Sequence, residues 1–263
     1  MARRFVGLIG LGLWLALGAG LLAADFRIEN RVFVNDEPEP VSESTTLFRG
    51  GRVFDFLGGP DAEVAVFDSA NQRFVLLEPT HRVKTEIKTE YIDAWVAALQ
   101  KKAVGHENKF VRFLAEPKFD RQFDQSAGRL TMASPVMTYY VDTAPAESEQ
   151  AAREYAQFAD AYARLSALTN PVPLPPFPRL AVNAALRERK ELPKRVERVT
   201  ERIGPGPLPD KKVTMRSEHK IAWQLLESDI KRIDRAAEQL ATFTTIPLEA
   251  YRSSTAEPQT AQR

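Results

Sequence analysis

Hydrophobic and polar residues alternate along residues 26–34. Phe26, Ile28, Val32 and Val34 share one side of this stretch, and mostly charged residues occupy the positions between them. A period of two gives a β-strand one dry face and one wet face. A polar turn at residues 35–40 follows. We therefore expect the folded part of the chain to begin with a half-buried strand.

Five further β-rich runs, joined by short turns, follow between residues 41 and 87. They cover residues 44–48, 53–57, 63–68, 73–77 and 82–87. Glycine pairs at 50–51 and 58–59 separate the first three of these runs. Such a pair is a strong hairpin signal, because glycine reaches positive φ without a Cβ clash. This part of the chain is therefore predicted to be an antiparallel meander.

The apolar spacing changes to three and four residues after the meander. Ile92, Trp95, Val96 and Leu99 form a stripe of this kind, which predicts an amphipathic helix over residues 89–102. The same spacing predicts helices over residues 147–168 and 228–241. Their apolar stripes need a common dry surface, and the inward faces of the strands supply one. We expect all three helices to cover one face of the sheet.

The remaining segments complete the predicted sheet and its connections. Residues 110–123 favour a short helix or an irregular cover, residues 171–178 an extended proline-rich connector, and residues 180–190 another helix. Further strands are expected at residues 130–133, 137–141, 196–203 and 211–225. The prediction is an α+β fold, in which a curved antiparallel sheet is covered on one face by helices.

The N-terminus has the layout of a secretory signal. Residues 5–24 carry no charge, Arg3 and Arg4 precede them, and Asp25 ends the run. We predict a signal peptide at residues 1–24, a single folded domain at residues 25–252 and a disordered polar tail at residues 253–263. An exported, periplasmic protein follows from this layout. The alternative is a membrane anchor through residues 5–24, because about 20 apolar residues can span a bilayer.

Charge and cysteine content narrow the function classes. The chain has 36 basic and 35 acidic residues, a formal net charge of +1. This balance gives no sign of the basic face that nucleic acid requires. The chain has no cysteine, which excludes disulfides, thiolate metal sites and a cysteine nucleophile. We expect no nucleic-acid partner and no cofactor.

No set of catalytic or metal-binding residues can be assembled from the sequence. His81, His106 and His219 lie on distant segments without metal-ligand spacing. No serine lies in a nucleophile elbow between glycines. His219 is either a polar group inside a ligand cavity or a core histidine bonded to the backbone or to Ser217, and the core role is favoured. We predict a protein that is not an enzyme and has no metal site.

Three of the strand-like runs resemble the periplasmic lipoprotein-carrier superfamily, the LolA/LolB-like proteins. The runs are Arg52–Phe56, Glu63–Asp68 and Arg73–Pro79. Nearly all of the chain after the predicted signal, including Leu174–Leu180, is also similar to uncharacterised exported proteins of planctomycete-type bacteria, a family without an established activity. The superfamily resemblance implies a half-open β-barrel whose apolar interior holds a lipid or a lipoprotein acyl chain. Two long C-terminal helices depart from that pattern.

A half-open barrel would need an apolar interior lining with a polar group in it. The candidate lining, and therefore the candidate ligand site, is Phe54, Phe56, Val64, Val66, Met215, His219 and Trp223. The side assigned to Phe54 and Phe56 competes with an assignment of Val53 and Leu57 to the interior. Such a lining suits a non-catalytic carrier or binder of an apolar ligand. It equally suits a structural or interaction protein with a cell-envelope partner and an interior filled by its own side chains. The oligomeric state does not follow from the sequence.

Overall fold

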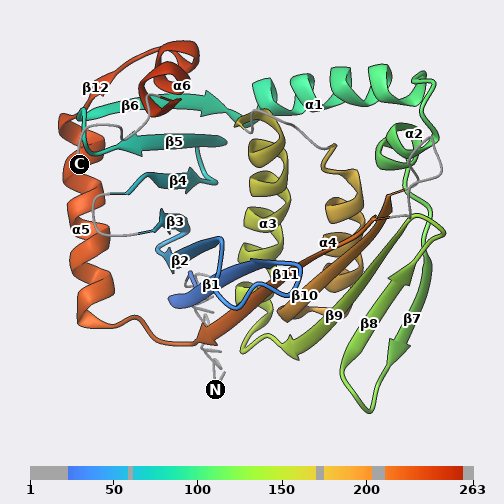
Figure 1. Cartoon of the computed structure of the whole chain (residues 1–263). Coiled ribbons are helices and arrows are strands. Elements are labelled where there is room, and N and C mark those ends of the chain that lie inside the picture. The colour runs from blue at the N-terminus through green and yellow to red at the C-terminus, as the bar shows by residue number, and fades with distance from the viewer. Residues whose placement is uncertain (1–22, 59–61, 170–174, 203–210, 257–263) are drawn as a thin grey trace, which may run out of the picture.

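The computed structural model describes residues 23–58, 62–169, 175–202 and 211–256 (Figure 1). Twelve strands in these residues form one open sheet, and all neighbours pair antiparallel except β12 with β6. Their bounds are β1 Phe26–Val34, β2 Ser42–Arg49, β3 Arg52–Leu57, β4 Val64–Asp68, β5 Arg73–Glu78, β6 Val83–Lys88, β7 Asp120–Asp124, β8 Arg129–Ala133, β9 Met137–Pro145, β10 Glu191–Arg202, β11 Lys211–Ala222 and β12 Thr244–Thr245. Their order is β12-β6-β5-β4-β3-β2-β1-β11-β10-β9-β8-β7.

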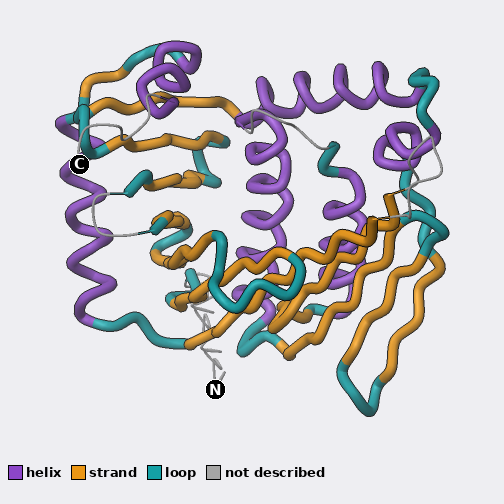
Figure 2. Tube along the Cα trace, in the orientation of Figure 1, coloured by secondary structure: helices purple, strands orange, loops and turns teal. Residues whose placement is uncertain are grey.

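Six helices complete the described part of the chain. They are α1 Thr89–Val104, α2 Lys109–Ala115, α3 Glu149–Thr169, α4 Phe177–Arg189, α5 Glu227–Thr242 and α6 Leu248–Ala256. Figure 2 shows the strands as a continuous orange band that bends around the purple helices α3 and α4. The predicted α+β class with a large, mostly antiparallel sheet is therefore confirmed. The sheet is not closed into a barrel, because β12 and β7 end its strand order.

The hairpin between β2 and β3 shows why the meander forms where the sequence predicts it. Arg49 lies opposite Arg52 in the antiparallel register, so Gly50 and Gly51 alone make the turn. Their φ angles are 59° and 75°. Only glycine adopts two successive positive φ angles of this kind without steric cost. The six strands expected before residue 89 all form, and they run in sequence order through the sheet.

Strand β1 joins the two halves of the sheet. It pairs with β2 on one side and with β11 on the other, where Ile28 lies opposite Ile221 and Asn30 lies opposite His219. A strand from the start of the domain therefore lies beside one from near its end. Because this pairing bridges both halves, the structure shows one continuous sheet.

Helix α5 lies on the opposite face of the sheet from α1 and α3, with strands β3–β5 between them (Figure 1). Its residues Ile233 and Ala236 pack with Phe54 and Val66, whereas neighbouring strand residues such as Val53 pack toward α3. The prediction that the helices 89–102, 147–168 and 228–241 all cover one face is therefore wrong for the third helix. Strands β3–β5 are apolar on both faces, so they can bury both sides.

A buried ion pair holds α5 on this face. Arg27 Nη1 lies 3.2 Å from Asp229 Oδ2, and the Asp229 side chain is only 3% exposed. The same Asp229 oxygen accepts a 2.8 Å hydrogen bond from the backbone N–H of Leu226, just before the helix begins. Arg27 lies on the side of β1 that alternation predicts to be wet. The helix covers that side locally, because the acid at its first turn gives the guanidinium a partner.

Two further segments differ from the sequence prediction. Residues 110–123 contain α2 and then β7, which pairs with β8 as an edge strand. Residues 253–256 belong to α6 rather than to a disordered tail, and residues 257–263 lie outside the described residues. So do residues 171–174 of the proline-rich segment and residues 1–22 of the predicted signal. Phe177 and Pro178, predicted to be extended, begin α4 instead. Within the described residues no helix is both long and apolar enough to cross a membrane.

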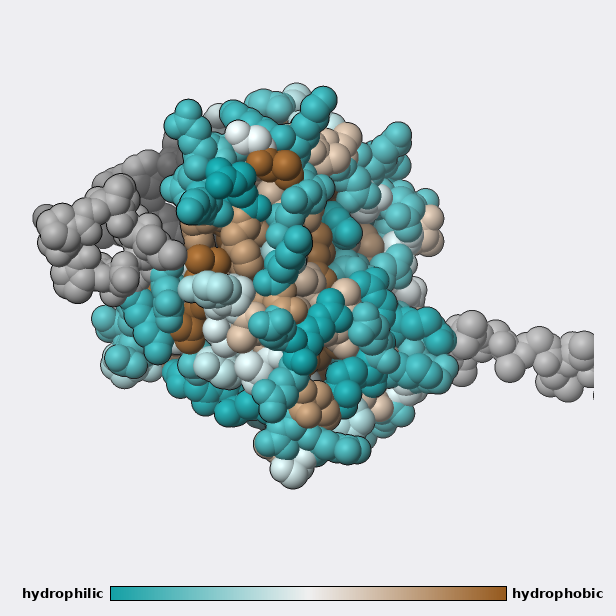
Figure 3. All heavy atoms as spheres, turned by 90° about the vertical axis from the view of Figure 1, so that its right-hand side faces the viewer, coloured by the Kyte–Doolittle hydropathy of each residue, from teal (hydrophilic) through white to brown (hydrophobic). Residues whose placement is uncertain are grey.

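Seen from the right-hand side of Figure 1, hydrophilic atoms dominate the surface and hydrophobic atoms gather in a central band between them (Figure 3). Large exposed apolar residues in the described chain are few and lie on separate elements. They are Val41, Tyr91, Val104, Tyr140 and Leu226. Scattered single residues of this kind are ordinary on a protein surface and indicate no large docking face.

Candidate functional site

A cavity of about 470 Å³ lies between the inner face of the sheet and helices α3 and α4. Strands β1, β2, β3, β9, β10 and β11 contribute to its floor, and Leu114 of α2 also lines it. Its volume falls within the range of roughly 300–1,000 Å³ that is usual for small-molecule sites. The bend of the sheet around α3 and α4 creates this space.

Apolar and aromatic side chains make up much of the cavity wall. Phe48 from β2 and Phe158 from α3 meet edge to face with ring centroids 5.7 Å apart. Leu57, Met137 and Tyr155 line the cavity with them. Phe48 and Phe158 are themselves buried in the main core. The apolar wall is therefore an extension of the core, and its shape is fixed by packing on both sides.

A chain of hydrogen bonds crosses the floor of the cavity from β11 to β3. His219 Nδ1 lies 2.7 Å from Asn30 Oδ1, and Asn30 Nδ2 donates to Ser44 Oγ at 3.0 Å and to Thr46 Oγ1 at 2.9 Å. Thr46 Oγ1 donates to Asp55 Oδ1 at 2.6 Å. Because the Asn30 amide nitrogen donates to the two hydroxyls, its oxygen accepts from His219 Nδ1.

Burial controls the ionisation of both ends of this chain. Desolvation lowers the pKa of His219 to about 3, with the nearby charge of Arg179 as the second cause. Desolvation raises the pKa of Asp55, although hydrogen bonds from Thr46 and Tyr162 oppose the rise. His219 is thus neutral at pH 7, and its polar atoms are satisfied within the protein.

The bonding order Ser217, His219, Asn30 resembles that of a hydrolase triad, since Ser217 Oγ lies 3.0 Å from His219 Nε2. Two observations argue against that chemistry. A histidine with a pKa of about 3 is a weak general base at neutral pH. Ser217 is not among the residues that line the cavity. This arrangement satisfies the buried imidazole and explains why His219 can lie on the inner face.

Two arginines line the same cavity from opposite sides. Arg179 comes from the first turn of α4, and Arg198 comes from the middle of β10. Both lie close enough to Tyr139 to lower its pKa, although desolvation of the phenol is the larger effect and raises it. Arg198 Nη2 lies 3.7 Å from Met215 Sδ. The guanidinium groups therefore converge on one region of the cavity.

The structure divides the seven predicted lining residues between two faces. Met215 and His219 line the cavity, and Trp223 packs on Phe26 with ring centroids 5.3 Å apart at the edge of the inner core. The other four, Phe54, Phe56, Val64 and Val66, pack under α5 on the opposite face. Their assignment to the interior is wrong. Leu57 and Asp55 line the cavity instead, and Val53 belongs to the inner core.

Apart from His219, the polar residues of the cavity floor were missed, although the sequence carries a signal for them. Asn30 occupies the dry phase of its strand, between Ile28 and Val32. Asp55 interrupts an otherwise apolar run in the same way. A polar residue at an apolar position marks a buried polar group that needs partners. Arg198 and Arg179 had no such signal, because arginines are common on both strands and helices.

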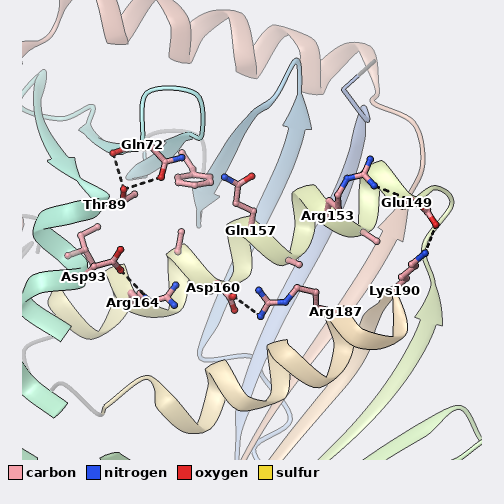
Figure 4. A pocket seen from close by; sticks show the side chains of 15 residues that line it. Gln72, Thr89, Asp93, Glu149, Arg153, Gln157, Asp160, Arg164, Arg187 and Lys190 are labelled. Atoms are coloured by element: carbon pink, nitrogen blue, oxygen red, sulfur yellow. Dashed lines mark hydrogen bonds and ion pairs between the residues drawn. The ribbon is translucent and has the colours of Figure 1, made fainter. Parts of the chain in front are cut away.

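A second hollow, of about 520 Å³, lies over α1, α3 and the end of α4. Figure 4 shows that its charged side chains point toward one another. Arg164 pairs with Asp93 at 3.4 Å, and Arg187 pairs with Asp160 at 3.0 Å. Because these charges satisfy each other at the surface, nothing in this hollow calls for a ligand.

Comparison with known proteins adds no assignment. No protein-family model matches the chain, and no curated protein matches its sequence. Among the described residues no group of three or more histidine or acidic side chains is placed to hold a metal ion. The cavity between the sheet, α3 and α4 is therefore the candidate site on its geometry alone.

Proposed function

We propose that this protein is a non-catalytic carrier or binder of an apolar, lipid-like ligand, which occupies the cavity between the sheet, α3 and α4. The observation that carries the proposal is a cavity of about 470 Å³ with an aromatic and aliphatic wall on the inner face of a bent sheet. In this proposal the sheet acts as the half-open, LolA-like barrel that the sequence resemblance implies. The ligand is then a lipid or a lipoprotein acyl chain.

The contrast with the opposite face supports a carrier over a purely structural role in the cell envelope. Under α5 the side chains of Phe54 and Val66 pack against Ile233 and Ala236. The hollow on that face is smaller, about 330 Å³, and is lined in part by Arg232 and Arg235. A structural protein with a self-filled interior would show the same packing on the inner face. An open volume there indicates a space that another molecule can fill.

Native mass spectrometry of the protein purified from its host tests the proposal. We expect a mass increment that is lost on denaturation and is identified as a lipid after extraction. Protein that carries no ligand in this experiment, and binds none when lipid is supplied, would favour the structural role.

A variant that fills the cavity makes this test specific. Ala163 lines the cavity from α3, so Ala163→Trp should remove the co-purifying lipid. Ala152 lies on the same helix in the outer hollow, and Ala152→Trp is the matched control that should retain lipid. Loss in both variants would show that the effect is not local to the cavity.

We also propose that the chain is exported and acts in the periplasm. The support is the uncharged run at residues 5–24 between Arg4 and Asp25. N-terminal sequencing of the protein from its host should find a mature chain that begins within a few residues of Asp25. Recovery of intact Met1 in the membrane fraction would favour the anchor instead.

A further inference from the structure

The two cavity arginines have no acidic partner within the described residues. Neither Arg179 nor Arg198 forms an ion pair there, although eighteen other pairs do form. Arg198 Nε is buried and has no hydrogen-bond partner. A guanidinium removed from water without a counter-ion is unfavourable. Both arginines are half-buried at one cavity, where a bound anion would supply the missing negative charge.

The start of α4 adds positive potential at the same place. Its first turn contains no acidic residue, and no side chain caps its N-terminus. Pro176 and Pro178 from this end of the helix line the cavity together with Arg179. Free N–H groups and the helix dipole favour an anion near a helix N-terminus. The N-terminus of α4 thus adds to the positive potential that the two arginines create in the cavity.

Asp55 does not neutralise these charges. It is the acidic residue that lines the cavity, but its hydrogen bonds go to Thr46, Tyr162 and Ser44. Its electrostatic partner is Arg232 of α5, and desolvation raises its pKa. Asp55 therefore belongs to the satisfied hydrogen-bond chain of the floor, and Arg179 and Arg198 remain available.

We propose that the ligand is an anionic single-chain amphiphile, whose carboxylate or phosphate group binds Arg179 and Arg198 while its chain lies along the aromatic wall. This inference rests on the proposed carrier function and names the chemical class of its ligand. Arginine suits the role because its planar fork presents two parallel N–H donors to carboxylate or phosphate oxygens. Tyr139 and Tyr155 lie beside the arginines and orient them, because each phenol is hydrogen-bonded to a guanidinium.

The size of the cavity fits one chain. A volume of about 470 Å³ holds about 15 groups the size of a water molecule, at roughly 30 Å³ each. A methylene group is of similar size, so a headgroup and a chain of about a dozen carbons fill the space. A two-chain phospholipid would not fit within it.

Equilibrium binding of matched probes to the full-length mature protein tests the inference. The probes are dodecanoate and dodecyl phosphate as anions, dodecanol as the neutral chain, and acetate and inorganic phosphate as anions without a chain. The variants are Arg179→Met, Arg198→Met and Arg198→Lys. Arg153→Met is the matched control, because Arg153 lies on α3 in the outer hollow.

We expect the anionic chains to bind at least 10-fold more tightly than dodecanol. Each Met variant should lose about 10- to 100-fold in affinity for the anionic chains, the worth of a hydrogen-bonded charge contact, and should keep its dodecanol affinity within about threefold. Arg198→Lys should lose less than Arg198→Met, because it keeps the charge and loses only the fork. Arg153→Met should match the unmodified protein. Retained dodecanol binding also shows that a variant is folded.

Other outcomes separate the two proposals. Equal binding of dodecanoate and dodecanol, unchanged in the Met variants, would overturn the anionic headgroup and leave the carrier function intact. Acetate or phosphate binding as tightly as the matching amphiphile would overturn the role of the chain. No binding of any probe with a chain would count against the proposed function itself.

Discussion

The two faces of strands β2 and β3 differ in chemistry, although the residues that form them alternate along the same short stretches of sequence. On the α5 face, Phe54, Phe56, Val64 and Val66 form an apolar layer that packs against Ile233 and Ala236. On the inner face, Thr46 and Asp55 take part in a hydrogen-bond chain at the edge of an open cavity. Consecutive residues Phe54 and Asp55 thus serve different purposes because their side chains point to opposite sides of one strand.

Large apolar side chains lie on both faces of these strands, so size and apolarity alone do not locate the inner cavity. Phe54 and Val66 are buried on the α5 face, and Phe67 and Phe74 are equally buried on the inner face. The inner face also carries the hydrogen-bond chain from His219 to Asp55, and Arg179 and Arg198 beside it form no ion pair among the described residues. The proposed ligand site therefore rests on the open volume together with these two arginines, and not on apolar side chains alone.

The largest expected change in stability comes from the face of the sheet that α5 covers. Phe54→Ala should lower the free energy of unfolding by about 3–5 kcal/mol, because it leaves a cavity under α5 that the neighbouring side chains do not fill. Chemical denaturation measures the loss. The affinity for a ligand in the inner cavity should stay unchanged in the folded fraction. A change in ligand affinity with little loss of stability would instead place the ligand site on the α5 face.

The next effect is a pH dependence on the inner face. The pKa of His219 falls from 6.5 to about 3 on folding, so between these values the unfolded chain binds a proton that the folded chain does not. Stability is therefore lost as the pH falls from 6.5 toward 3, by up to about 1.4 kcal/mol per pH unit.

Denaturation of the unmodified protein and of His219→Gln at several pH values isolates this contribution. As the pH is lowered, the unmodified protein should lose more stability than His219→Gln does. Asp55 has a raised pKa and contributes with the opposite sign, but it is present in both proteins and cancels in the difference. A difference that does not change between pH 7 and pH 4 would contradict a buried neutral imidazole.

A smaller effect is expected in the middle of the hydrogen-bond chain. Thr46→Val keeps the shape of the side chain but removes the donor to Asp55 and the acceptor for Asn30. We expect a loss of about 1–3 kcal/mol, the cost of buried polar groups left without a partner. Thr45→Val, one position along the same strand, is the control and should cost less. Equal losses in the two variants would show that the hydrogen bonds of Thr46 do not contribute to the stability of the protein.

The smallest effect is expected in the outer hollow of Figure 4. Asp93→Asn removes the ion pair with Arg164. The two charged groups lie 3.4 Å apart, and the Asp93 side chain is 62% exposed. A solvent-exposed pair contributes about 0–1 kcal/mol, and ligand affinity should not change. A marked loss of binding in this variant would move the functional site from the inner cavity to this hollow.

Much of the secondary structure could be read from residue patterns, while the site could not. The first strand follows from period-two spacing, the next five from β-rich runs between turns such as Gly50–Gly51, and the helix after them from period-3.6 spacing. Strand β7 was missed, because Asp120–Asp124 is a polar edge strand with no buried face to impose alternation. Six of the seven predicted lining residues were chosen as apolar and His219 as the polar group among them, and four of the apolar six lie on the α5 face.

The sequence by itself determined that this chain forms an antiparallel meander with amphipathic helices, because local periodicity and glycine turns act over a few residues. The tertiary structure alone decided which side α5 covers. Strands β3–β5 are apolar on both faces, so alternation does not distinguish them, and the Arg27–Asp229 ion pair joins residues about two hundred positions apart. The same holds for Arg179 and Arg198. Their convergence depends on how α4 packs over β10, and no local sequence pattern specifies how these two elements pack.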